Sequence, residues 1–295
     1  MDQRYLLGNE AIALACLESP VGFVSGYPGT PSSEVIEILA AHPDRSSYVE
    51  WSVNEKVAFE NALAAAWCGV RSLVTMKHVG LNVAADPLMT SAYTGVTGGF
   101  VIMSADDPFA HSSQNEQDSR MYAKFAKIPC LDPSTLQEAH DMIRDAFALS
   151  EALGLPVLFR PTTRICHSKS NVTVGPVLPY SGKGEFHKDP RQYVVIPAHT
   201  RILHRKLNEK QPAVRKRILE SGYNQYHFRG KRAIIASGIA AAYVQEIIPP
   251  DVSFMKIGAY PIDEEWLAGF VRKHQEVLVV EELFPVVEEV VREVA

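Results

Sequence analysis

Residues 22–41 read GFVSGYPGTPSSEVIEILAA, and this stretch decides the fold. The apolar run at 22–25 predicts a buried strand, and a turn rich in proline and glycine, 26–31, follows it directly. Residues 32–41 then place apolar side chains at helical spacing, after Thr30-Pro31, a cap residue followed by proline at the first helical position. The stretch predicts one strand–loop–helix unit of an α/β protein.

The same order recurs on both sides of this unit. Further apolar runs do not alternate with polar residues, which is typical of parallel strands that are buried on both faces. Strands alternating with helices indicate a parallel sheet covered on both sides. The predicted strands are 48–51, 72–76, 99–104 and 156–159, and the predicted helices are 9–17, 54–68 and 134–153.

The pattern weakens between about residues 175 and 229 and then returns. Residues 183–232 contain 13 Lys or Arg against 4 Asp or Glu. We therefore predict two α/β domains, 1–175 and 230–295, joined by a basic linker, 176–229, with one helix near 213–221. The second domain has predicted strands at 232–237, 252–257 and 276–280, and predicted helices at 238–247, 263–273 and 285–295.

Composition excludes several classes of protein. The chain has 295 residues, 46% of them hydrophobic, and a net charge of −5, so it is neither disordered nor collagen-like, and nucleic acid is not an expected partner. The N-terminus lacks the order of a signal peptide, and the uncharged run 87–105 contains proline and several glycines, so we expect a helix end, a loop and a buried strand there rather than a membrane span. The four cysteines lie at least 36 residues apart, which excludes a CxxC motif and predicts a cytoplasmic protein.

Polar or glycine-rich loops follow four of the predicted strands. Ligands bind at the carboxyl ends of strands in open parallel sheets, so we expect a site where the loops 26–31, 52–55, 77–80 and 106–117 meet. The motifs GxGxxG, GxxxxGK[ST], GxSxG and HExxH are all absent. The sequence therefore gives no support to the common phosphate loops, to a hydrolase with a nucleophile elbow or to a zinc protease.

Glu55 is the most informative single residue, because it lies in the first turn of an otherwise apolar helix. One interpretation is an acid that interacts favourably with the helix N-terminus; the other is a carboxyl group held near a cofactor nitrogen. Lys77 and His78 at a strand end are either a solvated basic pair or part of the same site. The polar stretch 111–117 is either a surface loop or the substrate side of that site.

Five segments in close order carry a resemblance to a known family: GNEAIALACLE, GYPGTPSSEVIE, VEWSVNEKVAFE, TMKHVGLNVAADPL and DDPFAHSSQNEQDSR. Together they resemble the N-terminal part of the α subunits of indolepyruvate ferredoxin oxidoreductases, which belong to the thiamine-diphosphate-dependent 2-oxoacid:ferredoxin oxidoreductases. The resemblance is dense over residues 5–170. RAIIASG and EVLVVEE resemble, more loosely, the transketolase-C-like second domain of that family.

The resemblance implies that residues 1–175 bind the pyrimidine of thiamine diphosphate. It implies a buried Glu55 with a raised pKa that donates a hydrogen bond to N1′ of the aminopyrimidine, and a His78 that donates to oxygen on the substrate. Thr30 is either a substrate contact or a plain helix N-cap, and Arg120 binds a carboxylate or forms a surface salt bridge. The implied cofactor contacts are Glu55, Gly29, Thr30, Gly80 and Asn82, the implied substrate contacts are Tyr27, Thr30, Lys77, His78, His111, Ser112, Ser113, Gln114 and Arg120, and no metal ligand is implied.

The sequence lacks the Gly-Asp-Gly stretch with which the family holds the diphosphate and Mg²⁺. The resemblance therefore implies a truncated or split α subunit, inactive without a partner that carries the diphosphate half-site. It also implies iron–sulfur clusters on partner chains, homodimeric pairing, and coenzyme A or partner contacts at the basic linker, whose alternative is a solvated loop. The implied reaction is oxidative decarboxylation of an aryl 2-oxoacid to an acyl-CoA with reduction of ferredoxin. A non-oxidative thiamine-dependent decarboxylase α chain and a non-catalytic assembly subunit stay open as alternatives.

Overall fold

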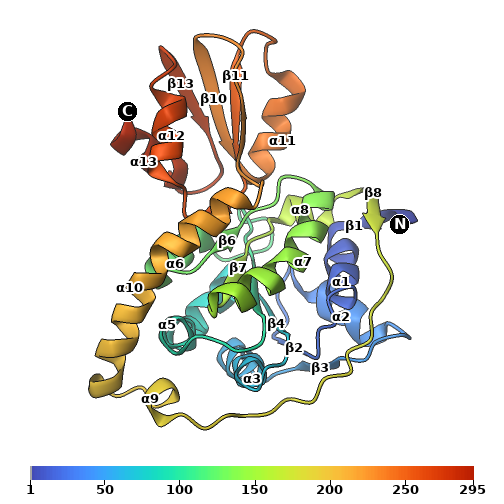
Figure 1. The fold of residues 1–295 in the computed structure, drawn as a ribbon. Helices are drawn as coiled ribbons and strands as arrows, with labels where there is room; N and C mark the ends of the chain where they lie inside the picture. The colour runs from blue at the N-terminus through green and yellow to red at the C-terminus, as the bar shows by residue number, and fades with distance from the viewer. Residues whose placement is uncertain (1) are drawn as a thin grey trace.

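A seven-stranded sheet forms the centre of the larger part of the chain in the computed structural model, which describes residues 2–295 (Figure 1). All of its neighbouring strands are parallel except the pair at one edge, β12 with β6, which is antiparallel. The predicted α/β fold with a mostly parallel sheet is confirmed. The strand order is β12 (Ala259–Tyr260), β6 (Cys130–Leu131), β7 (Val157–Phe159), β5 (Phe100–Ala105), β4 (Ser72–Lys77), β2 (Phe23–Gly26) and β3 (Tyr48–Trp51).

Helices cover both faces of this sheet, so neighbouring residues of its central strands are buried on opposite sides. Ile102 of β5 packs in one hydrophobic core with α3 and α5, whereas Val101 and Met103 pack in a second core with α1, α2 and α7. This two-sided burial explains why the strand sequences do not alternate. The helices are α1 (Gly8–Leu17), α2 (Ser33–Ala41), α3 (Glu55–Trp67), α4 (His78–Val83), α5 (Ala85–Thr94), α6 (Ser119–Ala126), α7 (Leu136–Leu153) and α8 (Thr163–His167).

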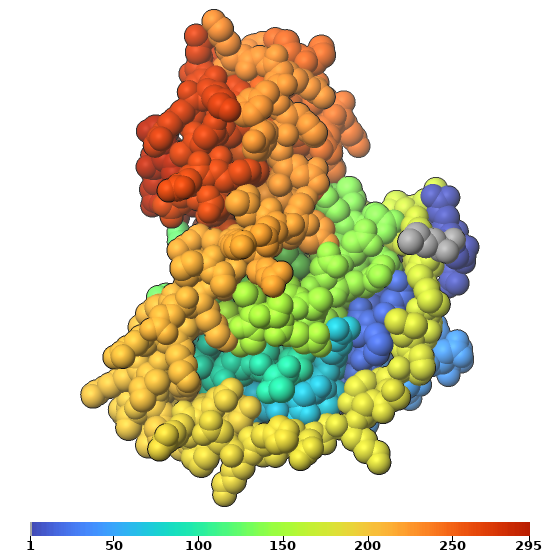
Figure 2. Space-filling model, in the orientation of Figure 1, coloured from blue at the N-terminus to red at the C-terminus, as the bar shows by residue number. Residues whose placement is uncertain are grey.

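The segment predicted as a linker runs along the surface of the larger part and is hydrogen-bonded to it. It leaves β8 (Lys169–Val174), which pairs antiparallel with β1 (Asp2–Leu7), and runs as an extended strap to α9 (Pro190–Tyr193) (Figures 1 and 2). The Tyr180 N–H donates to Ser46 Oγ at 2.6 Å, and the Glu185 N–H donates to the Cys68 carbonyl at 2.9 Å. These contacts hold the strap against residues far away in the sequence.

The helix predicted near residues 213–221 is the end of a much longer helix, α10 (Pro197–Glu220). Its buried stripe consists of Leu203, Leu207, Val214 and Ile218, and the other residues of the helix are mostly polar or charged. Pro212 interrupts the helical pattern in the sequence, yet the helix continues through it. The sparse apolar stripe and the internal proline together explain why only the last turns were predicted.

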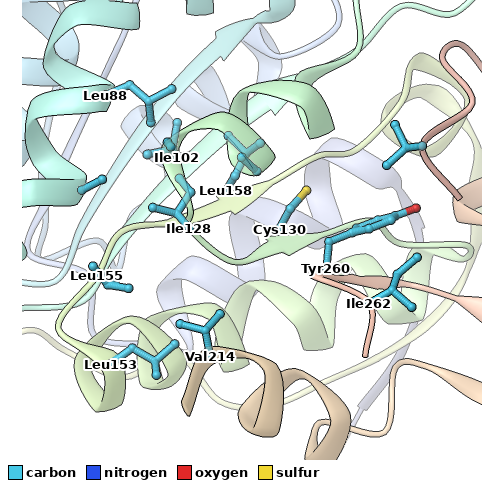
Figure 3. Close-up of a cluster of buried hydrophobic side chains, with 14 of the residues drawn as sticks. Leu88, Ile102, Ile128, Cys130, Leu153, Leu155, Leu158, Val214, Tyr260 and Ile262 are labelled. Carbon is cyan, nitrogen blue, oxygen red and sulfur yellow. The ribbon is translucent and has the colours of Figure 1, made fainter. Parts of the chain in front are cut away.

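A four-stranded sheet forms the centre of the C-terminal part, at the top of Figure 1. Every strand and helix predicted beyond residue 230 is present, and β9 and β12 are additional. Because β12 joins the larger sheet, the two parts share one core, in which Tyr260 and Ile262 lie with Cys130, and Val214 of α10 lies with Leu153 (Figure 3). The order is β13 (Glu276–Val280), β10 (Arg232–Ser237), β11 (Ser253–Ile257) and β9 (Gln225–His227), flanked by α11 (Gly238–Ile247), α12 (Glu264–Val271) and α13 (Val286–Val294).

The uncharged run 87–105 folds as predicted into the rest of α5, a loop and the buried strand β5. Across residues 2–295, none of the helices combines the length and the apolar composition that crossing a membrane requires.

Candidate functional site

Glu55 is the first residue of α3, and its carboxyl group lies against Gly80. The helix begins there because Asn54 caps it, its side chain accepting the Val57 N–H at 2.9 Å. A methyl group at Gly80 would lie 2.6 Å from Glu55 Oε1, so only glycine allows the carboxyl group this position. The resemblance implied a buried Glu55, but within this chain the residue is only half-buried. The fold thus brings together two predicted site residues, one from α3 and one from α4, that lie 25 positions apart in the sequence.

The turn after β2 lies beside Lys77. A methyl group at Gly29 would lie 3.0 Å from the Lys77 side chain, which places the lysine stem directly against this turn. The Gly29 N–H donates to Ser33 Oγ at 2.8 Å. Thr30 is exposed, and α2 begins only at Ser33 with Ser32 at the cap position, so the interpretation of Thr30 as a helix N-cap is wrong.

His78 is the first residue of α4 and is 1% exposed. Its Nε2 lies 3.0 Å from the carbonyl oxygen of Asn115, and because a carbonyl only accepts, Nε2 carries the proton. The other ring nitrogen, Nδ1, is buried and has no hydrogen-bond partner among residues 2–295. A buried polar atom without a partner costs free energy, and seven other buried side-chain atoms among residues 2–295 share this property. His78 Nδ1 therefore has hydrogen-bonding capacity left for a ligand, and its place at the carboxyl end of β4 puts that capacity where the site is expected.

Asp107, which the sequence interpretation missed, holds the predicted substrate loop in place. Its Oδ2 accepts the Ser112 N–H and the Ser113 hydroxyl, both at 2.8 Å, and its Oδ1 accepts the Thr163 hydroxyl at 2.7 Å. Burial alone would raise the pKa of Asp107, but these hydrogen bonds outweigh it and lower the pKa to about 2. The only signal in the sequence is its place directly after a buried strand.

The loop that Asp107 holds reaches both basic residues of the site. The Ser112 carbonyl accepts a hydrogen bond from Lys77 Nζ at 3.2 Å, and the Asn115 carbonyl accepts from His78. The hydroxyls of Ser112 and Ser113 are directed at Asp107 rather than outward. The structure therefore brings Ser112, Ser113, Lys77 and His78 together, as the sequence predicts.

Four other predicted residues lie toward the solvent. Tyr27 is 38% exposed, and His111 and Gln114 are exposed on the loop. Asn82 is also exposed, and it accepts a hydrogen bond from the hydroxyl of Tyr122. The structure therefore leaves these four predicted contacts open to solvent within this chain.

Arg120 does not belong to this group. It is 2% exposed, and it forms ion pairs with Asp118 at 2.6 Å and with Glu281 at 2.9 Å. Its remaining donors reach the Tyr260 and Ser237 hydroxyls and two carbonyls of the C-terminal part. Burial disfavours its charge, but the groups around it, Tyr260 and Asp118 foremost, raise the pKa of Arg120. The predictions of a substrate ligand and of a surface salt bridge are therefore both wrong. Arg120 is buried, and it joins α6 to the C-terminal part of the chain.

Comparison with known proteins identifies the family. Residues 15–226 match the profile described as pyruvate flavodoxin/ferredoxin oxidoreductase, thiamine-diphosphate-binding. The chain belongs to this family. The resemblance predicted from the five segments is confirmed, since the family member named indolepyruvate oxidoreductase subunit IorA of Methanothermobacter thermautotrophicus is 47% identical over 306 residues, which cover all of this chain and 49% of that protein.

Two further comparisons are consistent with this family. The IorA subunit of Thermococcus kodakarensis is 47% identical over 97% of this chain and 46% of its own length, so this chain spans about half the length of the curated relatives it matches. A solved 2-oxoglutarate:ferredoxin oxidoreductase from Magnetococcus marinus has a TM-score of 0.76 at 17% identity, covering 94% of this chain and 57% of that one. That likeness shows a common fold.

Proposed function

We propose that this chain supplies the aminopyrimidine-binding half of a thiamine diphosphate site in an indolepyruvate:ferredoxin oxidoreductase. The observation that carries the proposal is the contact of the Glu55 carboxyl group with Gly80 at the carboxyl end of the sheet, beside Lys77 and His78. The family profile supports the cofactor, and the relatives at 47% identity support the reaction.

The residues present fit the pyrimidine of the cofactor. Gly80 and Gly29 leave their side-chain space to Glu55 and Lys77, and His78 keeps one ring nitrogen without a partner. Bound thiamine diphosphate supplies the carbon nucleophile and the electron sink for decarboxylation of a 2-oxoacid. Glu55 would donate a hydrogen bond to the pyrimidine nitrogen N1′, while Asn54 fixes the turn of helix that presents it.

The basic pair would act on the substrate. Lys77 supplies a positive charge for the carboxylate of the 2-oxoacid, and the carbonyl of Ser112 orients its ammonium group. With Nε2 donating to the Asn115 carbonyl, Nδ1 of His78 would be the ring nitrogen that meets the keto oxygen. It would donate a hydrogen bond there, as negative charge develops, only when the ring carries a second proton. Thr30, Tyr27, Ser113 and Gln114 would line the outer side of the substrate, and Asn82 the rim of the cofactor site.

Indolepyruvate is a better substrate candidate than 2-oxoglutarate. The IorA relatives match essentially the whole chain at 43–47% identity, whereas the 2-oxoglutarate synthase subunit KorA of Methanothermobacter thermautotrophicus matches 59% of the chain at 25% identity. The product would be an acyl-CoA, with electrons passed to ferredoxin.

We assign the rest of the machinery to other domains or chains. These would hold Mg²⁺, the diphosphate and the iron–sulfur clusters, with residues 1–175 as the pyrimidine domain, 176–229 as a connector and 230–295 as the second domain. We further propose a two-fold pairing of this chain within a larger cytoplasmic complex that uses coenzyme A. Four free cysteines, three of them buried, are compatible with that compartment.

Replacing Glu55 tests the proposal. In the complex purified from its native source or co-expressed, Glu55→Gln and Glu55→Ala should lower indolepyruvate-dependent viologen reduction with coenzyme A by about 10²–10⁴-fold, the usual size of a proton-transfer contribution. Glu60→Gln is the matched control, because Glu60 is exposed on the same helix. Wild-type turnover by an intact Glu55→Ala complex would overturn the role of Glu55.

A further inference from the structure

A cavity of about 570 Å³ lies beneath α10, between this helix, α5, α9 and the turn that ends α7. Its walls include the residues just before β5 and β7, Gly95-Val96 and Gly154-Leu155. These are the amino ends of parallel strands, whereas Lys77 is the last residue of β4 and His78 follows it directly. Six residues of strand separate the two edges by about 20 Å, so the cavity is not part of the site proposed above.

The cavity combines an apolar wall with a surplus of positive charge. Arg191, Lys206 and Lys210 line it together with His199, and Asp189 is the single acid in the lining. The Asp189 carboxylate already accepts a hydrogen bond from the backbone N–H of Arg191 at 2.9 Å, as the N-cap of α9. Arg191 and Lys206 are exposed at the open side of the cavity, and neither has a carboxylate within 4.0 Å among residues 2–295.

Lys210 shows that this charge is uncompensated. Its Nζ donates to the carbonyls of Leu153 and Gly154 at 2.8 and 3.1 Å, so neutral oxygens are its partners. Burial and the nearby charge of Lys206 lower the pKa of Lys210. An anion in the cavity would offset both effects.

The apolar part of the wall and the volume suit an organic body rather than a bare ion. Leu203 and Leu207 of α10 face the cavity with Tyr93, Val96 and Leu155. The volume falls within the range of about 300–1,000 Å³ typical of small-molecule sites, which are mostly apolar with a few polar groups.

We propose that this cavity binds an organic phosphate, with its phosphate between Arg191 and Lys206 and its body against the apolar wall. A phosphate monoester carries close to two negative charges, which matches three cations and one acid better than a single carboxylate does. The phosphate could belong to a nucleotide or to an alkyl ester, and both share this chemistry. Such a ligand would stabilise the N-terminal half of α10 on the larger part of the chain.

Calorimetric titration of the assembled complex, without substrate or turnover, tests the site independently of the proposed reaction. The probes are AMP, hexyl phosphate and inorganic phosphate. AMP or hexyl phosphate should bind saturably at one site per chain, the tighter of the two identifying the organic body. Inorganic phosphate should bind at least about tenfold more weakly, because it buries no apolar surface.

Arg191→Ala/Lys206→Ala should weaken binding of the organic phosphate by about tenfold or more, the size of a lost charge-assisted hydrogen bond. The control is Lys216→Ala/Arg217→Ala, which removes two exposed cations of α10 outside the cavity and should leave affinity unchanged. The proposal is overturned if neither organic probe saturates at millimolar concentration, or if the control variant loses as much affinity as the cavity variant.

Discussion

Two groups of charged residues follow strands at the same edge of the large sheet, and they differ in how completely they are satisfied. Around Lys77 and His78, a buried ring nitrogen has no partner, and loop carbonyls hold the basic groups in place. Around Arg120, two carboxylates, two hydroxyls and two carbonyls take up the donors of one guanidinium. The comparison teaches that the Arg120 guanidinium has no hydrogen-bonding capacity left for a ligand, whereas His78 Nδ1 has.

The largest effect expected from this comparison is on folding. Arg120→Met leaves Asp118 and Glu281 buried without their cation, so the free energy of unfolding should fall by about 3–5 kcal/mol. Urea unfolding of the full chain measures it. Lys124→Met is the control, because Lys124 lies on the same helix as Arg120, and its ion pair with Glu289 of α13 is exposed and should contribute less than about 1 kcal/mol. If both variants lose the same small amount, the Arg120 network does not anchor the C-terminal part.

The second prediction concerns the unsatisfied group. His78→Gln retains a donor for the Asn115 carbonyl but removes Nδ1, so turnover of the complex should fall by about 100-fold. The free energy of unfolding should change by about 1 kcal/mol or less, because the retained hydrogen bond is the structural one. Viologen reduction and urea unfolding measure the two quantities.

His187→Gln is the matched control, since His187 is exposed on the strap outside the site and its variant should leave turnover unchanged. A normal turnover number for His78→Gln would remove this nitrogen from the mechanism. It would also show that an unpartnered buried atom does not distinguish the two groups.

The sequence predicts the local parts of both groups well. Buried parallel strands form contiguous apolar runs, so the positions of Lys77, His78 and the loop 106–117 at strand ends follow from the sequence without any partner being known. The contact of Glu55 with Gly80 spans 25 residues, and the same rule on strand ends predicts that their loops, 52–55 and 77–80, meet. The family resemblance added that both residues contact the cofactor.

The long-range partners are not predictable in this way. The sequence around Arg120 does not distinguish it from a surface arginine. Two of the residues that bind it, Tyr260 and Glu281, lie 140 and 161 positions away. Likewise the sequence places Asp107 at a strand end, but its partners are selected by the path of a loop that contains two residues in the left-handed region, Phe109 at φ 71° and Ala110 at φ 47°.

The smallest predicted effect links the two groups, because Asp107 begins the loop that ends at Asp118 beside Arg120. Its pKa of about 2 in the folded chain lies below the usual value of about 3.9, so its hydrogen bonds add stability above pH 4, and this stability is lost as the pH falls toward 2. Asp107→Asn should therefore lower the free energy of unfolding at pH 7 by about 1–2 kcal/mol, and the difference from the wild type should shrink between pH 4 and pH 3.

Urea unfolding at pH 7, 5, 4 and 3 measures this difference. Asp86→Asn is the control, because Asp86 is exposed and forms an exposed ion pair with Lys56, so its variant should differ little from the wild type at any of these pH values. A gap for Asp107→Asn that stays constant down to pH 3 would mean that the asparagine is penalised for its shape rather than for its lost charge. The loop would then be held by packing, and the position of the carbonyls that orient Lys77 and His78 would not depend on the ionised carboxylate.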